Sequence, residues 1–213
     1  MVYYSEYDFV YVDIFKSGST LIRTLFEYVL GYPPDEPFFK KQPRTYITVV
    51  RNPYDRLVTQ FYHANRIELW KEWKWAVHHP FFKKWVKETY ENGHSGNDGH
   101  MYSQVRLLKY YENRLPYTIF KLEELVPYEL FSFLPNYEER KEEINNKFLE
   151  ITADLENITH HATNNLKQGV WQSYYDEKTI EICNNYFASD FIVFNYEKIE
   201  PVEFGNKFKK GLI

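Results

Sequence analysis

The sequence predicts an α/β fold, with a single domain over residues 1–213 in which helices flank a central, mostly parallel sheet. Two observations lead to this prediction. Short runs of β-branched and aromatic residues alternate with longer amphipathic segments, which is typical of a parallel sheet covered on both faces. The length of 213 residues, with 44% hydrophobic residues, suits one domain with a core of its own.

Two buried strands and a short third strand are predicted from runs rich in β-branched and aromatic residues. They are DFVYVDIF (8–15), RTYITVV (44–50) and PYTIF (116–120). The N-terminal segment 1–15 carries acidic residues and lacks a basic start, so we interpret it as a strand and not as a signal peptide. The segment FIVFNY (191–196) fits either a final strand or a docked tail.

Helices are predicted where apolar residues recur at helical spacing. The first begins at Thr20 and ends before Gly31, and the second begins with Pro53 in its first turn. Further helices are predicted over 79–93, 101–111, 138–155 and 176–191. Between two of them, ENGHSGNDGH (91–100) is predicted to form a loop rich in Gly and Asn.

Composition argues against several classes of protein. The formal net charge of −4 disfavours a broad nucleic-acid-binding surface, so an anion site would be a local basic pocket. Cys183 is the only cysteine, which excludes an intrachain disulfide and a cysteine-based zinc site. The sequence has no run of about 18 apolar residues, so we expect no membrane span and a soluble, cytoplasmic protein. Nothing in the sequence indicates the oligomeric state.

The segment KSGST (16–20) joins the first predicted strand to the first predicted helix. The first N–H groups of a helix lack intrahelical partners and attract anions, and Gly18 allows successive N–H groups to face one group of oxygens. Hydroxyl groups come from Ser17, Ser19 and Thr20, and a positive charge comes from Lys16. The segment therefore predicts a phosphate site, with a plain turn capped by Ser19 as the alternative.

The segment TVVRNPYDRLVTQFYH (48–63) repeats this design, because a strand runs into Arg51 and a turn then opens a helix. Arg51 is expected at the carboxyl end of its strand, where open α/β sheets bind ligands. Thr59 follows two helical turns later, and an Arg fork with a hydroxyl suits a phosphate. A salt bridge is the alternative for Arg51. For Arg56, we favour a salt bridge with Asp55 or another nearby acid.

These segments resemble those of a known family. KSGST (16–20) and VVRNPYDRLVT (49–59) resemble the two nucleotide-binding motifs of sulfotransferases that use 3′-phosphoadenosine 5′-phosphosulfate (PAPS), and most of all those of the carbohydrate, Golgi-type group. Three later segments match that group in the same order, namely GHMYSQ (99–104), YTIFKLEEL (117–125) and NNYFASDFIVFNY (184–196). The resemblance implies the P-loop-like PAPS-binding sulfotransferase fold over nearly the whole chain.

The resemblance also implies a reaction. A sulfuryl group would pass from PAPS to an acceptor hydroxyl, which we expect to be on a sugar, with release of 3′-phosphoadenosine 5′-phosphate (PAP) and without a metal. Residues 16–20 would hold the 5′-phosphosulfate, and Arg51 with Thr59 would hold the 3′-phosphate. The family usually has Ser where this chain has Thr59, which keeps the hydroxyl. The anchor and paired cysteines of the Golgi members have no counterpart here, so a secretory location does not follow.

Sulfuryl transfer needs a group that stabilises negative charge on the leaving phosphate and a base that takes the proton of the acceptor. We expect Lys16 to be the first of these. The candidate bases are, in order, Glu36 between the two motifs, His100 after the Gly/Asn loop, and His63. The alternatives are a solvated loop carboxylate for Glu36, a pocket-shaping role for His100, and a packed or surface side chain for His63.

Two other functions fit the residues. A nucleotide or small-molecule kinase would use similar strand-end phosphate sites. Its Walker motif, however, needs a second Gly before the Lys, and Asp13 is a poor magnesium ligand. A non-catalytic module would bind PAP without a base. No metal cluster is predicted, because the adjacent histidine pairs 78–79 and 160–161 are interpreted as surface residues.

Overall fold

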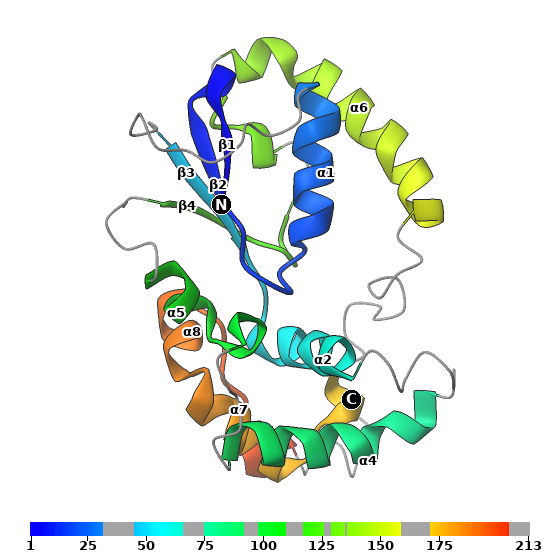
Figure 1. The fold of residues 1–213 in the computed structure, drawn as a ribbon, viewed down its shortest axis with the longest axis vertical. Helices are drawn as coiled ribbons and strands as arrows, with labels where there is room; N and C mark the ends of the chain where they lie inside the picture. The colour runs from blue at the N-terminus through cyan, green and yellow to red at the C-terminus, as the bar shows by residue number, and fades with distance from the viewer. Residues whose placement is uncertain are drawn as a thin grey trace. The chain divides into compact units, whose positions relative to one another are not determined.

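The computed structural model describes residues 1–31, 45–65, 75–91, 98–109, 117–125, 129–134, 136–158 and 171–204. The chain folds into two compact units (Figure 1). The first comprises Met1–Arg51 and Leu108–His161, and the second comprises Asn52–Leu107 and Ala162–Ile213. The assignment of residues 1–213 to a single domain stays a prediction.

The first unit contains a four-stranded sheet with the strand order β1-β2-β3-β4 (Figure 1). Its strands are β1 (Val2–Tyr4), β2 (Phe9–Val12), β3 (Thr45–Val50) and β4 (Tyr117–Lys121). β2, β3 and β4 run parallel, and β1 pairs antiparallel with β2. The predicted sheet is therefore confirmed, including the three strands expected near 8–15, 44–50 and 116–120.

The N-terminal segment was expected to be one strand over 1–15, and this is wrong in part. It forms a hairpin in which β1 and β2 are joined by the short 3-10 helix Ser5–Tyr7. Asp8 makes the turn with a φ of 54°, in the left-handed region that Asp tolerates better than most residues. Its carboxylate accepts a hydrogen bond from the Tyr3 hydroxyl at 3.3 Å. The antiparallel edge strand results from this local turn.

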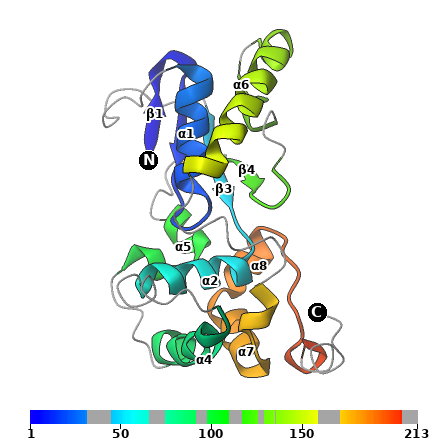
Figure 2. The ribbon, with the colours of Figure 1, turned by 90° about the vertical axis from the view of Figure 1, so that its right-hand side faces the viewer.

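Two helices cover one face of the sheet (Figures 1 and 2). They are α1 (Ser19–Leu30) and α6 (Tyr137–Ile158), which lie side by side. Their apolar faces and the alternating inward side chains of the strands form one buried cluster, which includes Phe9, Tyr11, Ile22, Leu25, Phe26, Val29, Ile47, Val49 and Ile144. Burial of these side chains is the main stabilising contribution in the first unit.

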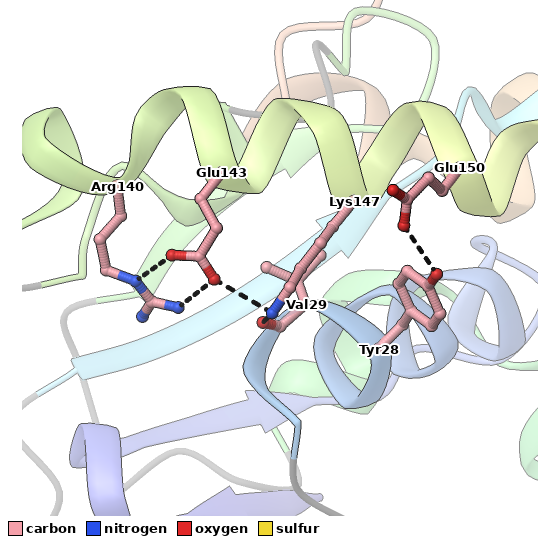
Figure 3. Close-up of polar contacts among 6 residues, drawn as sticks. All are labelled: Tyr28, Val29, Arg140, Glu143, Lys147 and Glu150. Atoms are coloured by element: carbon pink, nitrogen blue, oxygen red, sulfur yellow. Dashed lines mark hydrogen bonds and ion pairs between the residues drawn. The ribbon is translucent and has the colours of Figure 1, made fainter.

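Polar contacts join the C-terminal turn of α1 to α6 (Figure 3). The Lys147 ammonium donates to the Val29 carbonyl at 3.1 Å, and so satisfies one of the last carbonyls of α1. The Tyr28 hydroxyl donates to the Glu150 carboxylate at 3.1 Å. Gly31 ends the helix in the left-handed region, with a φ of 75°. α6 therefore holds the C-terminal end of α1, which is the end opposite to residues 16–20.

The second unit is helical. Its helices include α2 (Pro53–Ala64), α4 (Trp75–Val86) with a π-helical continuation (Lys87–Glu91), α5 (Gln104–Lys109), α7 (Glu177–Tyr186) and α8 (Ala188–Val193). α5 begins in this unit, and α2, α4 and α7 pack against one another (Figure 2). The core is rich in aromatic rings, among them Tyr54, Phe61, Phe82 and Phe187, and it encloses Cys183. None of the described helices is long and apolar enough to cross a membrane.

Two expectations for the C-terminal region need correction. The helix predicted over 176–191 is broken at Phe187 into α7 and α8. The strand alternative for 191–196 is wrong, because α8 continues to Val193 and the chain then turns. Burial follows a helical pattern here: Phe194 is buried, whereas Ile192 is 77% exposed. The 101–111 helix also begins later than expected, at Gln104, after a 3-10 turn over Gly99–Met101.

Candidate functional site

The loop after β2 has an unusual backbone. The N–H of Ser17 donates to the Ile14 carbonyl at 3.2 Å and closes a tight turn. Lys16 and Gly18, on either side of Ser17, both have positive φ, 66° and 78° respectively. α1 begins at Ser19, so Gly18 is its N-cap. The expected alternative in which Ser19 caps the helix is therefore wrong, because Ser19 is already helical.

This backbone leaves the start of α1 without a capping side chain. A helix whose N-cap is Gly presents its first N–H groups and the positive end of its dipole to whatever lies in front of them. The left-handed conformation of Lys16 costs roughly 1 kcal/mol, because its Cβ approaches the following carbonyl. Backbone strain of this kind is found at ligand-binding sites, so the loop has the features of an anion-binding site.

Arg51 meets this loop because β2 and β3 are neighbouring parallel strands. Val12 pairs with Thr48, and the Thr48 hydroxyl donates to the Val12 carbonyl at 2.9 Å. Arg51 follows the last residue of β3 directly and is buried. Its Nη1 donates to the Lys16 carbonyl at 3.4 Å. The structure therefore brings Arg51 to the loop of the first predicted anion motif, at the carboxyl edge of the sheet.

The third parallel strand ends at the same edge. Leu122, the residue after β4, donates its N–H to the Val50 carbonyl at 2.8 Å. Its side chain lies against Gly18, where a Cβ would stand 2.9 Å from Leu122 Cδ1. Lys121, the last residue of β4, forms an ion pair with Glu124 at 3.1 Å. Leu122 lies in the segment 117–125 but could not be singled out from the sequence, because its role depends on packing.

His100 lies in the second unit, in a network of its own. Its Nδ1 lies 2.7 Å from Asp98 Oδ1, and its backbone N–H donates to the same oxygen at 2.9 Å. The Gln60 amide donates to the His100 carbonyl at 2.6 Å. The ring of His63 lies 4.3 Å from that of His100, with the two planes 31° apart. The structure therefore brings two of the three candidate bases into contact.

Asp98 was missed by sequence analysis, although an Asp two residues before a His, at the start of a short helix, is a usable signal. Burial would raise the pKa of Asp98, but hydrogen bonds from the backbone and ring of His100 outweigh it and lower that pKa. A carboxylate bonded to Nδ1 favours the tautomer that carries its proton there, with the basic lone pair on Nε2. His100 is therefore oriented as a base would be.

Comparison with known proteins decides the family. The model of the sulfotransferase family matches residues 1–197. The chain belongs to the sulfotransferase family. A mostly parallel sheet flanked by helices agrees with the α/β fold of that family. No curated protein and no solved structure matches the chain.

Two residues predicted for nucleotide binding and catalysis remain, Thr59 and Glu36. Thr59 is buried on α2 in the second unit, and its hydroxyl donates to the Asp55 carbonyl at 3.1 Å. Its assignment to the 3′-phosphate stays a prediction. Glu36, the first candidate base, lies outside the described residues. Among the described residues, no group of three His, Cys, Asp or Glu side chains is arranged to hold a metal ion.

The second unit also buries two ionisable side chains, Asp190 and Arg56. Asp190 is fully buried and accepts the backbone N–H groups of Gln104 at 2.8 Å and Val105 at 2.9 Å. Burial raises the pKa of Asp190, and the positive charge of Arg56 opposes that rise. Arg56 is buried as well and donates to the Tyr102 carbonyl at 2.9 Å. Asp190 is thus an acid close enough to interact electrostatically with Arg56, and the expected salt bridge of Arg56 stays a prediction.

Proposed function

We propose that this sulfotransferase moves a sulfuryl group from PAPS to an acceptor hydroxyl, on a sugar, and releases PAP. One observation carries the proposal. Arg51 Nη1 reaches the Lys16 carbonyl at 3.4 Å, so the basic residues that follow two neighbouring strands lie together at the loop that leads into α1. The sugar acceptor is supported by the resemblance of five segments to the carbohydrate group.

The residues at this edge fit the charged ends of PAPS. The loop Lys16–Thr20 combines positive φ at two positions with an uncapped helix start, which suits a tetrahedral anion. Arg51 offers a planar fork in a buried setting, where a charge-assisted bond to phosphate is strongest. We propose that the loop holds the 5′-phosphosulfate and that Arg51, with Thr59, holds the 3′-phosphate.

In this mechanism PAPS supplies the activated sulfuryl group. Lys16 and the first N–H groups of α1 stabilise the charge that develops on the leaving phosphate. A base takes the proton of the acceptor hydroxyl. We propose His100 for this role because Asp98 orients its ring, with Glu36 as the competing candidate.

The proposal is tested by nucleotide selectivity. PAP carries a 3′-phosphate and AMP does not, so calorimetry with both ligands isolates the contribution of the 3′-phosphate site. We expect Arg51→Ala to lose roughly tenfold to hundredfold of the preference for PAP, as the removal of a charged hydrogen-bond partner costs about 1.5–3 kcal/mol. Arg51→Lys, with a thermal melt of each variant, guards against misfolding because Arg51 is buried.

Arg140→Ala is the matched control, because it removes the same charge from α6, where Arg140 pairs with Glu143 at 3.1 Å. It should keep the preference for PAP. If folded Arg51→Ala prefers PAP as strongly as the parent does, the assignment of Arg51 is wrong. Tight binding of ATP with magnesium, and none of PAP, would support a kinase. PAP binding without turnover across an acceptor panel would support a binding module.

A further inference from the structure

We propose that Leu122 is a positioning residue for the phosphate loop: it sets the conformation of residues 16–20 and so the affinity for the nucleotide. The inference rests on the proposed function for its ligand, but its structural part concerns the first unit alone. Leu122 is hydrophobic and lies far along the chain from both anion motifs. Its influence would act through Gly18 and Val50, which it contacts.

The first contact is between the Leu122 side chain and Gly18. A Cβ added to Gly18 would stand 2.9 Å from Leu122 Cδ1 and 3.2 Å from Cδ2. Gly18 also has a φ of 78°, which side chains rarely adopt. Leu122 packs against the same buried cluster as α1. The isobutyl group of Leu122 therefore packs directly against the loop at Gly18. Only a glycine at position 18 lets the loop approach this side chain so closely.

The second contact is between the Leu122 backbone and β3. Its N–H donates to the Val50 carbonyl at 2.8 Å, one residue before Arg51. Lys121 pairs with Val50 in the sheet, and the Glu124 N–H donates to the Lys121 carbonyl at 3.1 Å, so a turn begins directly after the strand. The sheet thus fixes the backbone of Leu122, and its side chain supports the loop.

Together these contacts link Leu122, the loop and the end of β3 to one another. Leu122 touches Gly18 through its side chain and Val50 through its backbone, and Arg51 returns to the loop through the Lys16 carbonyl at 3.4 Å. A displacement of the loop would therefore alter the position of its N–H groups relative to the Arg51 fork. Misplacement of a binding group by about 1 Å can cost a hundredfold in rate or binding. A shorter side chain at position 122 should have this effect.

The test compares Leu122→Ala with Leu125→Ala. Leu125 lies three residues on and packs against the same cluster, so its truncation controls for lost apolar burial. We expect Leu122→Ala to weaken PAP binding by about tenfold to a hundredfold, whereas Leu125→Ala keeps it within about twofold. Hydrogen exchange of residues 17–22, without nucleotide, should accelerate in Leu122→Ala and remain near parental in Leu125→Ala.

A double-mutant cycle tests the contact itself. Gly18→Ala should weaken PAP binding in the parent, and less so in the Leu122→Ala background, because the δ carbons that meet the new Cβ are then absent. Additive effects, parental PAP affinity in Leu122→Ala, or equal losses in both leucine variants would each overturn the inference. If the parent binds no PAP, the proposed function fails, and hydrogen exchange alone then decides whether Leu122 holds the loop.

Discussion

Lys16 and Gly18 both adopt positive φ, but a lysine does so at a cost that a glycine avoids. We therefore expect Lys16 to contribute either its side-chain charge or the position of its carbonyl, which accepts a hydrogen bond from Arg51 Nη1. Replacement with glycine would relax the backbone and remove the charge together, whereas replacement with alanine removes the charge and keeps the strain. This pair of variants separates the two contributions at one position.

We expect Lys16→Ala and Lys16→Gly to lower kcat more than they weaken PAP binding, because the ammonium is needed most as the leaving phosphate gains charge. Lys16→Gly should be the more thermally stable of the two. Single-turnover rates, PAP calorimetry and melting curves measure the three quantities. Lys16→Arg, which keeps the charge, should retain most activity. Equal losses in rate and affinity would mean that Lys16 only anchors the nucleotide.

The two candidate bases predict different pH dependence. A His base gives a rate that rises through roughly pH 6.5, whereas an ordinary carboxylate, near 4.3, gives a flat rate over the same range. For His100→Ala we expect a loss of about 10²–10⁴ in rate and parental PAP affinity. Glu36→Gln should turn over at the parental rate.

Asp98→Asn provides the sharper control for His100. It keeps the shape of the side chain but removes the charge that faces Nδ1 at 2.7 Å. The ring then loses the carboxylate that favours a proton on Nδ1 and a lone pair on Nε2, so kcat should fall while PAP affinity stays parental. A flat profile together with a slow Glu36→Gln would assign the base to Glu36. His63→Gln measures what the neighbouring ring contributes.

At the scale of elements, α1 is fixed at both ends. Its N-terminus lies at the loop that Leu122 supports, and its last carbonyls meet Lys147 of α6. Glu143 lies between Arg140 and Lys147, at 3.1 Å and 3.0 Å (Figure 3). Two hydrogen bonds, of which the one from Arg140 has the larger effect and the one from Lys147 the smaller, lower the pKa of Glu143 from 4.5 to about 2. The orientation of α1 thus depends partly on an ionised carboxylate on α6.

This lowered pKa predicts an acid-sensitive contribution to stability. A carboxylate whose pKa is depressed in the folded state stabilises the fold above its ordinary pKa, and the contribution is lost as the pH falls from 4.5 to about 2. Because Glu143 is 47% exposed, screening should limit it to about 1 kcal/mol or less. Urea unfolding of Glu143→Gln should show a deficit at pH 7 that vanishes near pH 2. A deficit of equal size at both pH values would contradict the assignment.

Much of the element structure was predictable, and the errors have local causes. β2, β3 and β4 were recognisable because their residues form continuous apolar runs. The break at Phe187 was not, since apolar spacing continues through it and a buried aromatic ring fits either side of the joint. The β1–β2 hairpin escaped prediction because it depends on the left-handed φ of Asp8, which no periodicity reveals.

At the scale of the whole molecule, the convergence of Lys16 and Arg51 followed from topology, because parallel strands in a sheet end at one edge. Leu122 and Asp98 could not be found in this way. Leu122 matters through a contact with a glycine about a hundred residues away, and Asp98 through the ring that it holds. Such pairings depend on three-dimensional packing. The family match indicates sulfuryl transfer, and these contacts identify the residues at which substitutions should be made.

The buried Cys183 has a practical consequence. It is the single thiol in the chain, and burial raises its pKa, so it should resist alkylation in the folded protein. Cysteines introduced at exposed positions, such as Glu139 in the first unit and Lys198 in the second, should therefore react selectively with maleimide dyes. A dye at either position would label its own unit alone, without first removing a native cysteine from the aromatic core.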